Sequence, residues 1–331
     1  MLFRSMFHVN AWGLAHAGVA SGAGLVMPGA DLSGRGLANL IVEERVTVAA
    51  GVPTIWMQVL PELAGRDASS LRAIPCGGSA VPRALSEGYR AQIGLPLLQA
   101  WGMTETSPIC AVAHLDADEQ HLDDDTKAEL RTMVGRISFG VEMRVVDPSS
   151  GEPVPWDGEA TGELQCRGNW IAASYHDDPR SGESFTEDGW LRTGDVGMVD
   201  ARGYVQLTDR TKDVIKSGGE WISSVDLEDA LLKHKSVAEV AVVAVDDTRW
   251  QERPLAIVRS KAGCDGETLP GELRSFLVDK VAKFWVPEYW AVVDDIPKTS
   301  VGKMDKKLLR EEVAAGRLAI QKHLGFGEVN D

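Results

Sequence analysis

The stretch Thr208-Asp-Arg-Thr-Lys-Asp-Val-Ile-Lys-Ser-Gly-Gly-Glu-Trp221 separates two different patterns in this sequence. Before it, over residues 135–207, short β-forming runs are separated by turn residues. After it, mixed helical and strand patterns return. We therefore expect a domain boundary at Asp209, with a large domain over residues 1–208 and a small one over residues 209–331.

The first part of the chain predicts alternating strands and helices. A buried strand over residues 71–76 is followed by a helix over 82–93 and by a further strand over 95–100. Strand, turn, helix and strand in this order are typical of a doubly wound α/β sheet. We expect a partial sheet of this kind within residues 1–134.

The β-rich part over residues 135–208 predicts a small β-barrel or two-sheet subdomain, of which we expect the barrel, because short strands such as Gly162-Glu-Leu-Gln-Cys166 alternate with turns. The last part predicts a small α+β domain. Its expected elements are helices over residues 224–234 and 269–281 and strands over residues 237–245 and 255–260. The fold class expected for the whole chain is therefore α/β.

Charged residues outside the motifs are expected to be solvated. Residues 114–131 carry many Asp and Glu side chains and few apolar ones, which favours a solvated loop over a metal site. Lys306 and Lys307 are expected to be surface residues that aid solubility.

Composition narrows the class of protein. The 331 residues are 44% hydrophobic and 25% charged, as in ordinary globular proteins, and the net charge of −15 argues against a broad nucleic-acid surface. The four cysteines are widely spaced and the seven histidines form no HExxH pattern, so thiols are expected rather than disulfides or a zinc site. No apolar run reaches the roughly 20 residues that span a bilayer. A cytoplasmic location is the expectation.

Two motifs follow the strands of the expected sheet, where open α/β folds bind ligands. Gly77-Gly-Ser-Ala80 follows the first strand, and its glycines would let a flat ring approach the backbone; a tight turn would account for them equally well. Trp101-Gly-Met-Thr-Glu-Thr106 follows the next strand. It offers an aromatic face, the Thr104 hydroxyl for phosphate, and the Glu105 carboxylate as a hard ligand for Mg²⁺.

Three further motifs carry charged or glycine-rich chemistry. In Trp190-Leu-Arg-Thr-Gly-Asp195 the carboxylate can accept hydrogen bonds from two ribose hydroxyls. Lys216-Ser-Gly-Gly-Glu-Trp-Ile222 can expose backbone groups to a ligand or form a β-hairpin turn. Pro297-Lys-Thr-Ser-Val-Gly-Lys303 presents a lysine on a loop, where an ammonium can counter negative charge in a transition state.

These motifs, in this order, resemble those of the acyl-adenylate-forming (AMP-binding) superfamily, and within it the medium- and long-chain fatty acyl-CoA synthetases. The resemblance implies ATP-dependent, Mg²⁺-dependent adenylation of a carboxylic acid, followed by thioester formation with CoA. It implies a nucleotide site made of Gly77, Gly78, Ser79, Ala80, Trp101, Gly102, Met103, Thr104, Asp195 and Arg210. Thr104, Glu105 and Lys303 would be catalytic, with Glu105 as the metal ligand.

The resemblance also assigns the remaining motif residues. It implies that Asp209 is the hinge before a mobile C-terminal domain, and that His8 and Trp12 line the acyl pocket, although a lone histidine is as often structural. The CoA contacts that it implies are Ser217, Gly218, Gly219, Glu220 and Trp221.

One part of the family pattern is missing. Members carry a Ser/Thr/Gly-rich phosphate-gripping loop well upstream of the segment that matches His8, and this sequence has no such loop. We therefore expect an N-terminally truncated chain with impaired ATP handling. A homodimer, or a second chain that supplies the missing part, is the partner expected besides the small-molecule substrates.

Three alternatives stay open at this stage. The same adenylation could serve another acyl acceptor, such as a carrier protein. The chain could bind an acyl-adenylate without catalysis, as a fragment or as half of a split enzyme. A nicotinamide-dependent dehydrogenase is disfavoured, because no G-x-G-x-x-G follows a strand.

Overall fold

The computed structural model describes residues 9–148, 150–179, 181–210, 212–218, 220–261, 266–299 and 304–323; of Glu220 only the backbone is described. By its internal contacts the chain divides into two compact units. The first unit comprises Met1–Thr193 and Gly197–Leu207, and the second comprises Gly194–Val196 and Thr208–Asp331. Each unit has its own hydrophobic core.

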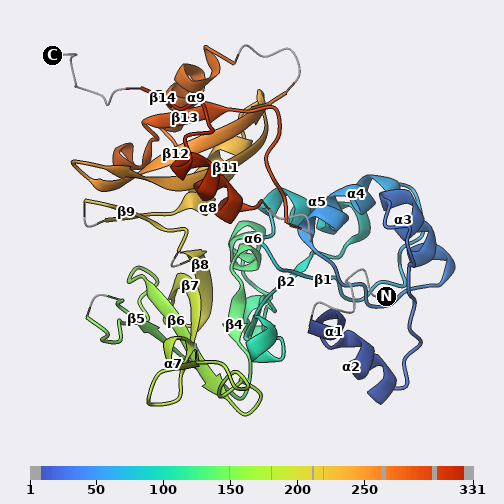
Figure 1. Ribbon diagram of the computed structural model, residues 1–331. Helices are drawn as coiled ribbons and strands as arrows, with labels where there is room; N and C mark the ends of the chain where they lie inside the picture. The colour runs from blue at the N-terminus through green and yellow to red at the C-terminus, as the bar shows by residue number, and fades with distance from the viewer. Residues whose placement is uncertain are drawn as a thin grey trace. The chain divides into compact units, whose positions relative to one another are not determined.

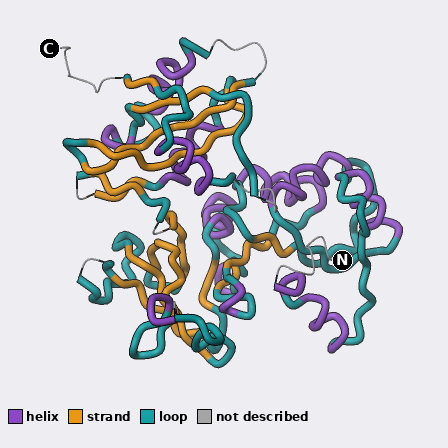
Figure 2. The backbone as a smooth tube through the Cα atoms, in the orientation of Figure 1, coloured by secondary structure: helices purple, strands orange, loops and turns teal. Residues whose placement is uncertain are grey.

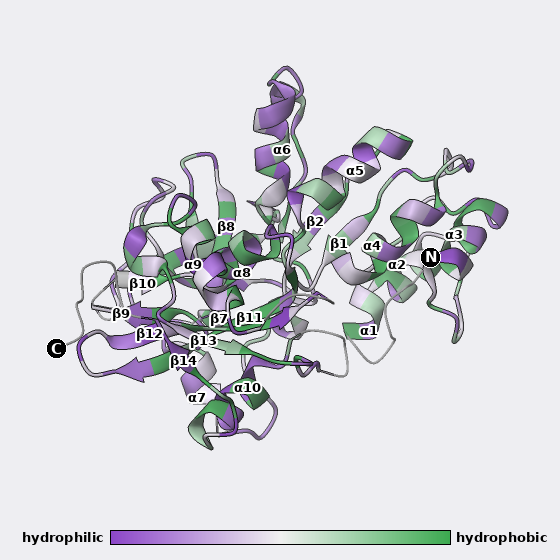
Figure 3. Ribbon diagram, turned by 90° about the horizontal axis from the view of Figure 1, so that it is seen from above, coloured by the Kyte–Doolittle hydropathy of each residue, from purple (hydrophilic) through white to green (hydrophobic). Residues whose placement is uncertain are grey.

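The first unit begins with helices that surround two short parallel strands (Figure 1). The helices are α1 (Val9–Trp12), α2 (Leu14–Ala20), α3 (Gly34–Glu43), α4 (Pro53–Glu62) and α5 (Arg83–Ile93), and the strands are β1 (Pro75–Gly77) and β2 (Leu98–Trp101). Helix α5 carries both hydrophilic and hydrophobic stretches along its length (Figure 3). It buries Leu85 and Tyr89 in the core, where the Tyr89 ring meets the Trp56 ring edge-on with centroids 5.8 Å apart. This packing anchors the strands that carry the first two motifs.

The remaining strands extend the same sheet. They are β3 (Ala111–Val112), β4 (Gly135–Ile137), β5 (Val141–Val146), β6 (Gly162–Gly168), β7 (Leu191–Val199) and β8 (Tyr204–Arg210), accompanied by α6 (Asp124–Thr132), α7 (Ser181–Ser184) and two 3₁₀ turns, η1 (Thr104–Thr106) and η2 (Ala117–Glu119). The strand order is β1-β2-β3-β4-β8-β7-β6-β5. Strands β1 and β2 pair parallel to each other, whereas β2 with β3 and β3 with β4 pair antiparallel. The chain therefore has the mixed α/β fold that the sequence predicts.

The expected small β-barrel is the one difference in fold class. Among the described residues this sheet is open, with β5 at its edge. Closure would require β5 to pair with β4, but both edges of β4 are already occupied, by β3 and β8. The β-rich part is thus a continuation of the doubly wound part rather than a separate barrel.

The second unit is a small α+β structure in which strands form one sheet flanked by helices (Figure 2). Its strands are β9 (Ile215–Ser217), β10 (Glu220–Ile222), β11 (Val237–Asp247), β12 (Gln251–Ser260), β13 (Tyr289–Val292) and β14 (Gln321–Lys322), and its helices are α8 (Ser224–Leu232), α9 (Leu269–Leu277), the 3₁₀ turn η3 (Lys283–Trp285) and α10 (Lys306–Ala314). The long β11–β12 hairpin is buried on both faces, because Val240 and Val242 belong to one core cluster and Ala241 and Val243 to another.

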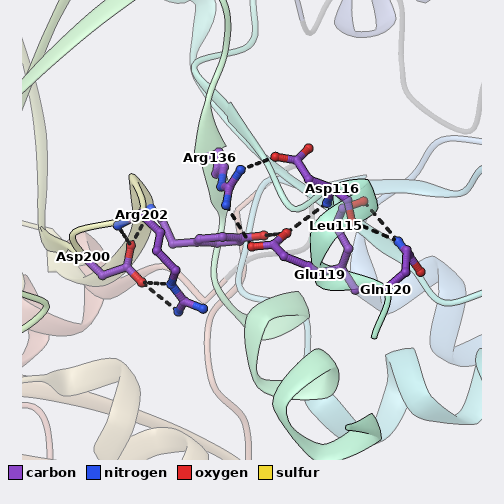
Figure 4. A network of polar contacts seen from close by, with 8 residues as sticks. Leu115, Asp116, Glu119, Gln120, Arg136, Asp200 and Arg202 are labelled. Atoms are coloured by element: carbon purple, nitrogen blue, oxygen red, sulfur yellow. Dashed lines mark hydrogen bonds and ion pairs between the residues drawn. The ribbon is translucent and has the colours of Figure 1, made fainter. Parts of the chain in front are cut away.

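The acidic segment is more ordered than the expected solvated loop. Asp123 caps α6 by accepting a hydrogen bond from the Thr126 backbone N–H at 2.9 Å. Glu119 is only 5% exposed. Its carboxylate accepts a hydrogen bond from the Tyr204 hydroxyl at 2.6 Å and pairs with Arg136 at 2.8 Å (Figure 4). The prediction of a loop was wrong here because the acidic side chains serve as helix caps and as ion-pair partners.

This network makes stability depend on pH. Burial by itself would raise the pKa of Glu119, but hydrogen bonds from Tyr204 and the Asp116 backbone N–H, with the charge of Arg136, hold that pKa below its usual value. Folding therefore gains stability from Glu119 above the pKa that the residue has in the unfolded chain. That contribution is lost as the pH falls through the lower pKa of the folded state.

We expect Glu119→Gln to lower the free energy of unfolding at pH 7 by about 1–2 kcal/mol, because it removes a charged partner from a buried network. Below pH 4 the difference from the wild type should shrink. Urea unfolding at both pH values measures it. Glu129→Gln, an exposed change on the same stretch of chain, should leave both values unaltered. An equal loss at both pH values would contradict the electrostatic explanation.

Candidate active site

The first two motifs lie on adjacent parallel strands of the first unit. Gly77 on β1 is in register with Ala100 on β2, so the segments that follow the two strands leave the sheet at the same edge. Gly78, Ser79 and Ala80 follow β1 and are all exposed. A Cβ on Gly77 would come within 2.5 Å of the Ala100 carbonyl oxygen and 3.8 Å of the Trp12 ring. The structure thus brings Trp12 beside the first motif.

The segment after β2 is tightly wound. The Thr106 hydroxyl accepts a hydrogen bond from the Met103 backbone N–H at 2.9 Å, and it lies 2.8 Å from the Pro108 carbonyl oxygen. A Cβ on Gly102 would fall 1.8 Å from that oxygen, so only glycine fits at this position. The winding leaves Thr104 exposed and Met103 half-buried. Thr104 is therefore accessible to a ligand.

Trp101 departs from the simplest expectation for an adenine-stacking ring. It is 8% exposed and belongs to the core cluster that includes Cys110 and Leu164. The ring therefore offers little surface to a nucleotide in this structure, and its assignment to the adenine site remains a prediction.

Glu105 is held by a residue that the sequence did not single out. The Tyr175 hydroxyl donates a hydrogen bond to Glu105 Oε1 at 2.6 Å, and the Glu105 carbonyl oxygen accepts one from the Ala172 N–H at 2.8 Å. Tyr175 lies 70 residues further along the chain, with no motif around it. Only the fold shows that it orients this carboxylate.

The residues expected to hold ribose form a pair within the second unit. Asp195, on β7, is 6% exposed, and its Oδ1 lies 3.2 Å from the Nε of Arg210, at the end of β8. The Arg210 side chain is 54% exposed. The pair thus combines a nearly buried carboxylate with a guanidinium that solvent or a ligand can reach.

The expected CoA segment is a β-hairpin. Strands β9 and β10 pair antiparallel, and Gly218, with φ of +61°, lies in the turn between them. A Cβ on Gly218 would fall 2.7 Å from the Trp250 ring, and the Gly218 N–H donates a hydrogen bond to the Trp250 carbonyl oxygen at 2.8 Å. The hairpin turn that the motif predicted is thus present. It does not exclude the other interpretation, because a hairpin turn can also expose backbone groups to a ligand.

A buried arginine, Arg253, holds this hairpin through Ser217. It is 4% exposed, and its guanidinium donates a hydrogen bond to Ser217 Oγ at 3.0 Å and pairs with Glu288 at 3.1 Å. Ser217 is itself buried, and Trp221 is half-buried. Because a buried arginine reaches Ser217, the side chain of this serine is a structural part of the hairpin. Arg253 had no signal in the sequence.

Three predicted site residues lie outside the described residues: His8, Gly219 and Lys303. Their assignments therefore stay predictions. The described candidates fall into two groups. In the first unit Gly77, Thr104 and Glu105 belong to segments that leave neighbouring strands. In the second unit Asp195 and Arg210 form a pair, and Ser217 and Gly218 lie on the hairpin.

Family models match both units. Residues 1–176 match the model of the AMP-binding enzyme, and residues 226–303 match that of the AMP-binding enzyme C-terminal domain. The chain belongs to the AMP-binding enzyme family. The resemblance inferred from the motifs is thereby confirmed.

Relatives in the AMP-binding enzyme family include CoA ligases. The chain is 42% identical over 311 residues to a long-chain-fatty-acid–CoA ligase of Thermus thermophilus, covering 93% of this chain and 57% of that protein. It is 41% identical over 310 residues to a 3-methylmercaptopropionyl-CoA ligase of Ruegeria pomeroyi, covering 93% and 56%. The chain thus spans little more than half the length of these relatives.

Solved structures of the family share the fold. ATP-bound MatB from Rhodopseudomonas palustris matches with a TM-score of 0.79 and 27% identity, over 93% of this chain and 58% of that one. The o-succinylbenzoate CoA synthetase of Bacillus subtilis, in complex with its acyl-adenylate intermediate, matches with a TM-score of 0.79 and 28% identity, over 92% and 59%. The fold described above is therefore one on which other proteins hold a nucleotide or an acyl-adenylate.

The AMP-binding enzyme family uses Mg²⁺. Glu105 could supply one ligand to this ion. Tyr175 occupies one carboxylate oxygen, which leaves the other as a hard donor. Within the described residues no group of three or more His, Cys, Asp or Glu side chains could hold a metal ion. A magnesium ion at Glu105 would thus need most of its ligands from phosphate and water, as is usual for this ion.

In the described part of the chain, no helix is both long enough and apolar enough to cross a bilayer.

Proposed function

We propose that this chain carries the AMP-binding and CoA-binding parts of an AMP-forming acyl-CoA synthetase. The observation that supports it most is the Asp195–Arg210 pair at 3.2 Å, which offers a carboxylate and a reachable guanidinium to a ribose. The similarity of the chain to CoA ligases, at 42% identity to the Thermus thermophilus protein, supports the same reaction class. Fatty acids of medium or long chain are the proposed substrates, with ATP and CoA.

The proposed reaction has two steps. A carboxylate oxygen attacks the α-phosphorus of ATP, the bond to pyrophosphate breaks, and an acyl-adenylate forms. The CoA sulfur then attacks the acyl carbon, the carbon–sulfur bond forms, and AMP leaves with the oxygen. Asp195 and Arg210 hold the ribose in both steps, and Lys303 stabilises charge on the phosphate in the first. The backbone of the Gly218 hairpin guides CoA in the second.

Other residues prepare the phosphate end. The exposed Thr104 hydroxyl donates to a phosphate oxygen, and Tyr175 keeps the Glu105 carboxylate in place. Mg²⁺, when bound at Glu105, neutralises phosphate charge. Asp209 is proposed as the hinge between the steps, because a few residues at the end of an element suffice for such a pivot.

Two assays of the purified chain test the proposal. One supplies fatty acid, ATP, Mg²⁺ and CoA, and the other supplies CoA with a preformed acyl-adenylate; acyl-CoA is measured in both. We expect thioester formation from the adenylate, with a much lower rate from ATP, because the phosphate-gripping loop is missing from the sequence. Adenylate binding without turnover in either assay would favour a binding role instead.

Location and partners are the remaining parts of the proposal. We expect the chain to work in the cytoplasm, either as a homodimer or with a second chain that completes the AMP-binding domain. Sedimentation of the purified chain, alone and after mixing with an N-terminal portion of a relative, distinguishes these states. A monomer in both samples would contradict both.

A further inference from the structure

The carboxylate of Asp209 is fully engaged inside the second unit. It is 7% exposed. Its Oδ2 accepts two hydrogen bonds from Ser224, one from the backbone N–H at 2.7 Å and one from the hydroxyl at 2.6 Å. Its Oδ1 accepts a hydrogen bond from the Arg210 N–H at 2.7 Å. The residue proposed as the hinge is therefore tied to the start of α8.

The Ser224 hydroxyl is at the same time the acceptor of a second group. Lys306 Nζ lies 2.6 Å from Ser224 Oγ. An ammonium can only donate hydrogen bonds and an ionised carboxylate can only accept them. The single hydroxyl proton must therefore point to Asp209, and the order of donation is Lys306 to Ser224 to Asp209. Each member of this chain depends on the next.

Lys306 is not the solvated lysine that its sequence context predicted. Its side chain is 13% exposed, whereas that of Lys307 is 81% exposed. Besides Ser224 it contacts Glu228 Oε1 at 2.7 Å, and the same oxygen accepts a hydrogen bond from the Val242 N–H at 2.7 Å. The prediction failed because α10 turns its first residue inward, onto the N-terminal turn of α8.

Arg310 makes a second contact from the same face of α10. It lies four residues after Lys306, so the two side chains project from one side of the helix. Arg310 pairs with Asp213, which is 12% exposed. Asp209 and Asp213 bracket the segment that contains Arg210. One helix face thus holds both ends of the hinge segment.

We propose that Lys306 is a positioning residue: through the Ser224 hydroxyl it fixes Asp209, and with Arg310 it holds the hinge segment against α10. Arg210 follows Asp209 directly and pairs with Asp195, so this clamp also orients the ribose contact. The catalytic meaning of the clamp rests on the proposed function; its existence does not. Movement at Asp209 would require its bonds to Ser224 to break or to be carried along.

Hydrogen exchange of single amides tests the clamp without any activity assay. In Lys306→Met the Ser224 amide, which donates to Asp209, should exchange about tenfold faster than in the wild type. Trypsin should also cleave after Arg210 and Lys212 several-fold faster. Lys306→Arg should restore most of the protection, because it keeps a cationic donor at the same place. Lys307→Met, the same change one residue later on the exposed face, should leave both values unaltered.

A second variant separates the clamp from the ion pair with Glu228. Ser224→Ala keeps Lys306 and Glu228 together but removes the hydroxyl link to Asp209. It should reproduce the faster cleavage after Arg210 and raise the Kd for AMP about threefold. Unchanged cleavage in Ser224→Ala, or equally faster exchange of amides throughout β11 and β12, would overturn the proposal. A responsive clamp in a protein that makes no acyl-CoA would overturn only the proposed function.

Discussion

Replacing Lys303 with alanine should lower the rate of adenylation by about 100- to 1000-fold, because the loss of one aligned cation from a developing phosphate charge has an effect of this size. Thioester formation from a preformed acyl-adenylate should fall far less, since the phosphate chemistry is then already complete. Pyrophosphate release measures the first step, and acyl-CoA formation from the adenylate measures the second.

The control for this variant is Lys307→Ala. Lys307 is 81% exposed, and its Nζ lies 3.9 Å from Glu311 Oε1. It should leave both steps unchanged. An equal loss of both steps in Lys303→Ala would count against a dedicated role in adenylation. Full activity of that variant would remove Lys303 from the proposed mechanism.

Asp195→Ala should weaken AMP binding by about 30-fold, which corresponds to about 2 kcal/mol, the usual effect of losing hydrogen bonds to a charged group. The carboxylate is nearly buried and its partner Arg210 is not, so the variant removes both the ribose acceptor and the group that orients the guanidinium. Isothermal titration with AMP measures the change directly.

Two further variants sharpen this test. Asp195→Asn keeps the shape and one acceptor oxygen, so its loss of affinity should be intermediate. Asp188→Ala removes an exposed carboxylate that pairs with Arg144 in the first unit, and it should bind AMP as the wild type does. Unchanged AMP affinity in Asp195→Ala would exclude Asp195 from the ribose site.

Local sequence patterns predicted most helices and strands well. The expected helix over residues 82–93 is α5, and the one over residues 224–234 is α8, two residues shorter at its end. The expected strand over residues 71–76 is found only as the short β1. The neighbouring segment before Pro53 pairs with residues 71–76 through isolated parallel bridges, such as Val48 to Ala73. The hydrogen-bonded strand therefore stays short. The sheet is open rather than a barrel because of how strands that are distant in sequence pair with one another. The alternation of apolar and polar residues along one strand cannot show this pairing.

Motifs located candidate residues but not the residues that hold them in place. Glu105 is visible in Trp101-Gly-Met-Thr-Glu-Thr106, whereas Tyr175 becomes relevant only when the chain brings its hydroxyl to that carboxylate. Lys306 looked like Lys307 in sequence, and the two differ only in the direction in which α10 turns them. Local chemistry can thus be read from residue types, while support from distant segments depends on tertiary packing.

The buried thiols of the first unit give a means of observing its unfolding alone. Cys76, Cys110 and Cys166 are all fully buried, and the sulfurs of the last two lie 3.6 Å apart. Burial raises the pKa of Cys76 well above the usual range, which keeps this thiol unreactive while the fold persists. Cys264 is the remaining cysteine of the sequence. In a Cys264→Ser background, alkylation by a maleimide dye would therefore report when the first unit opens, whatever the second unit does.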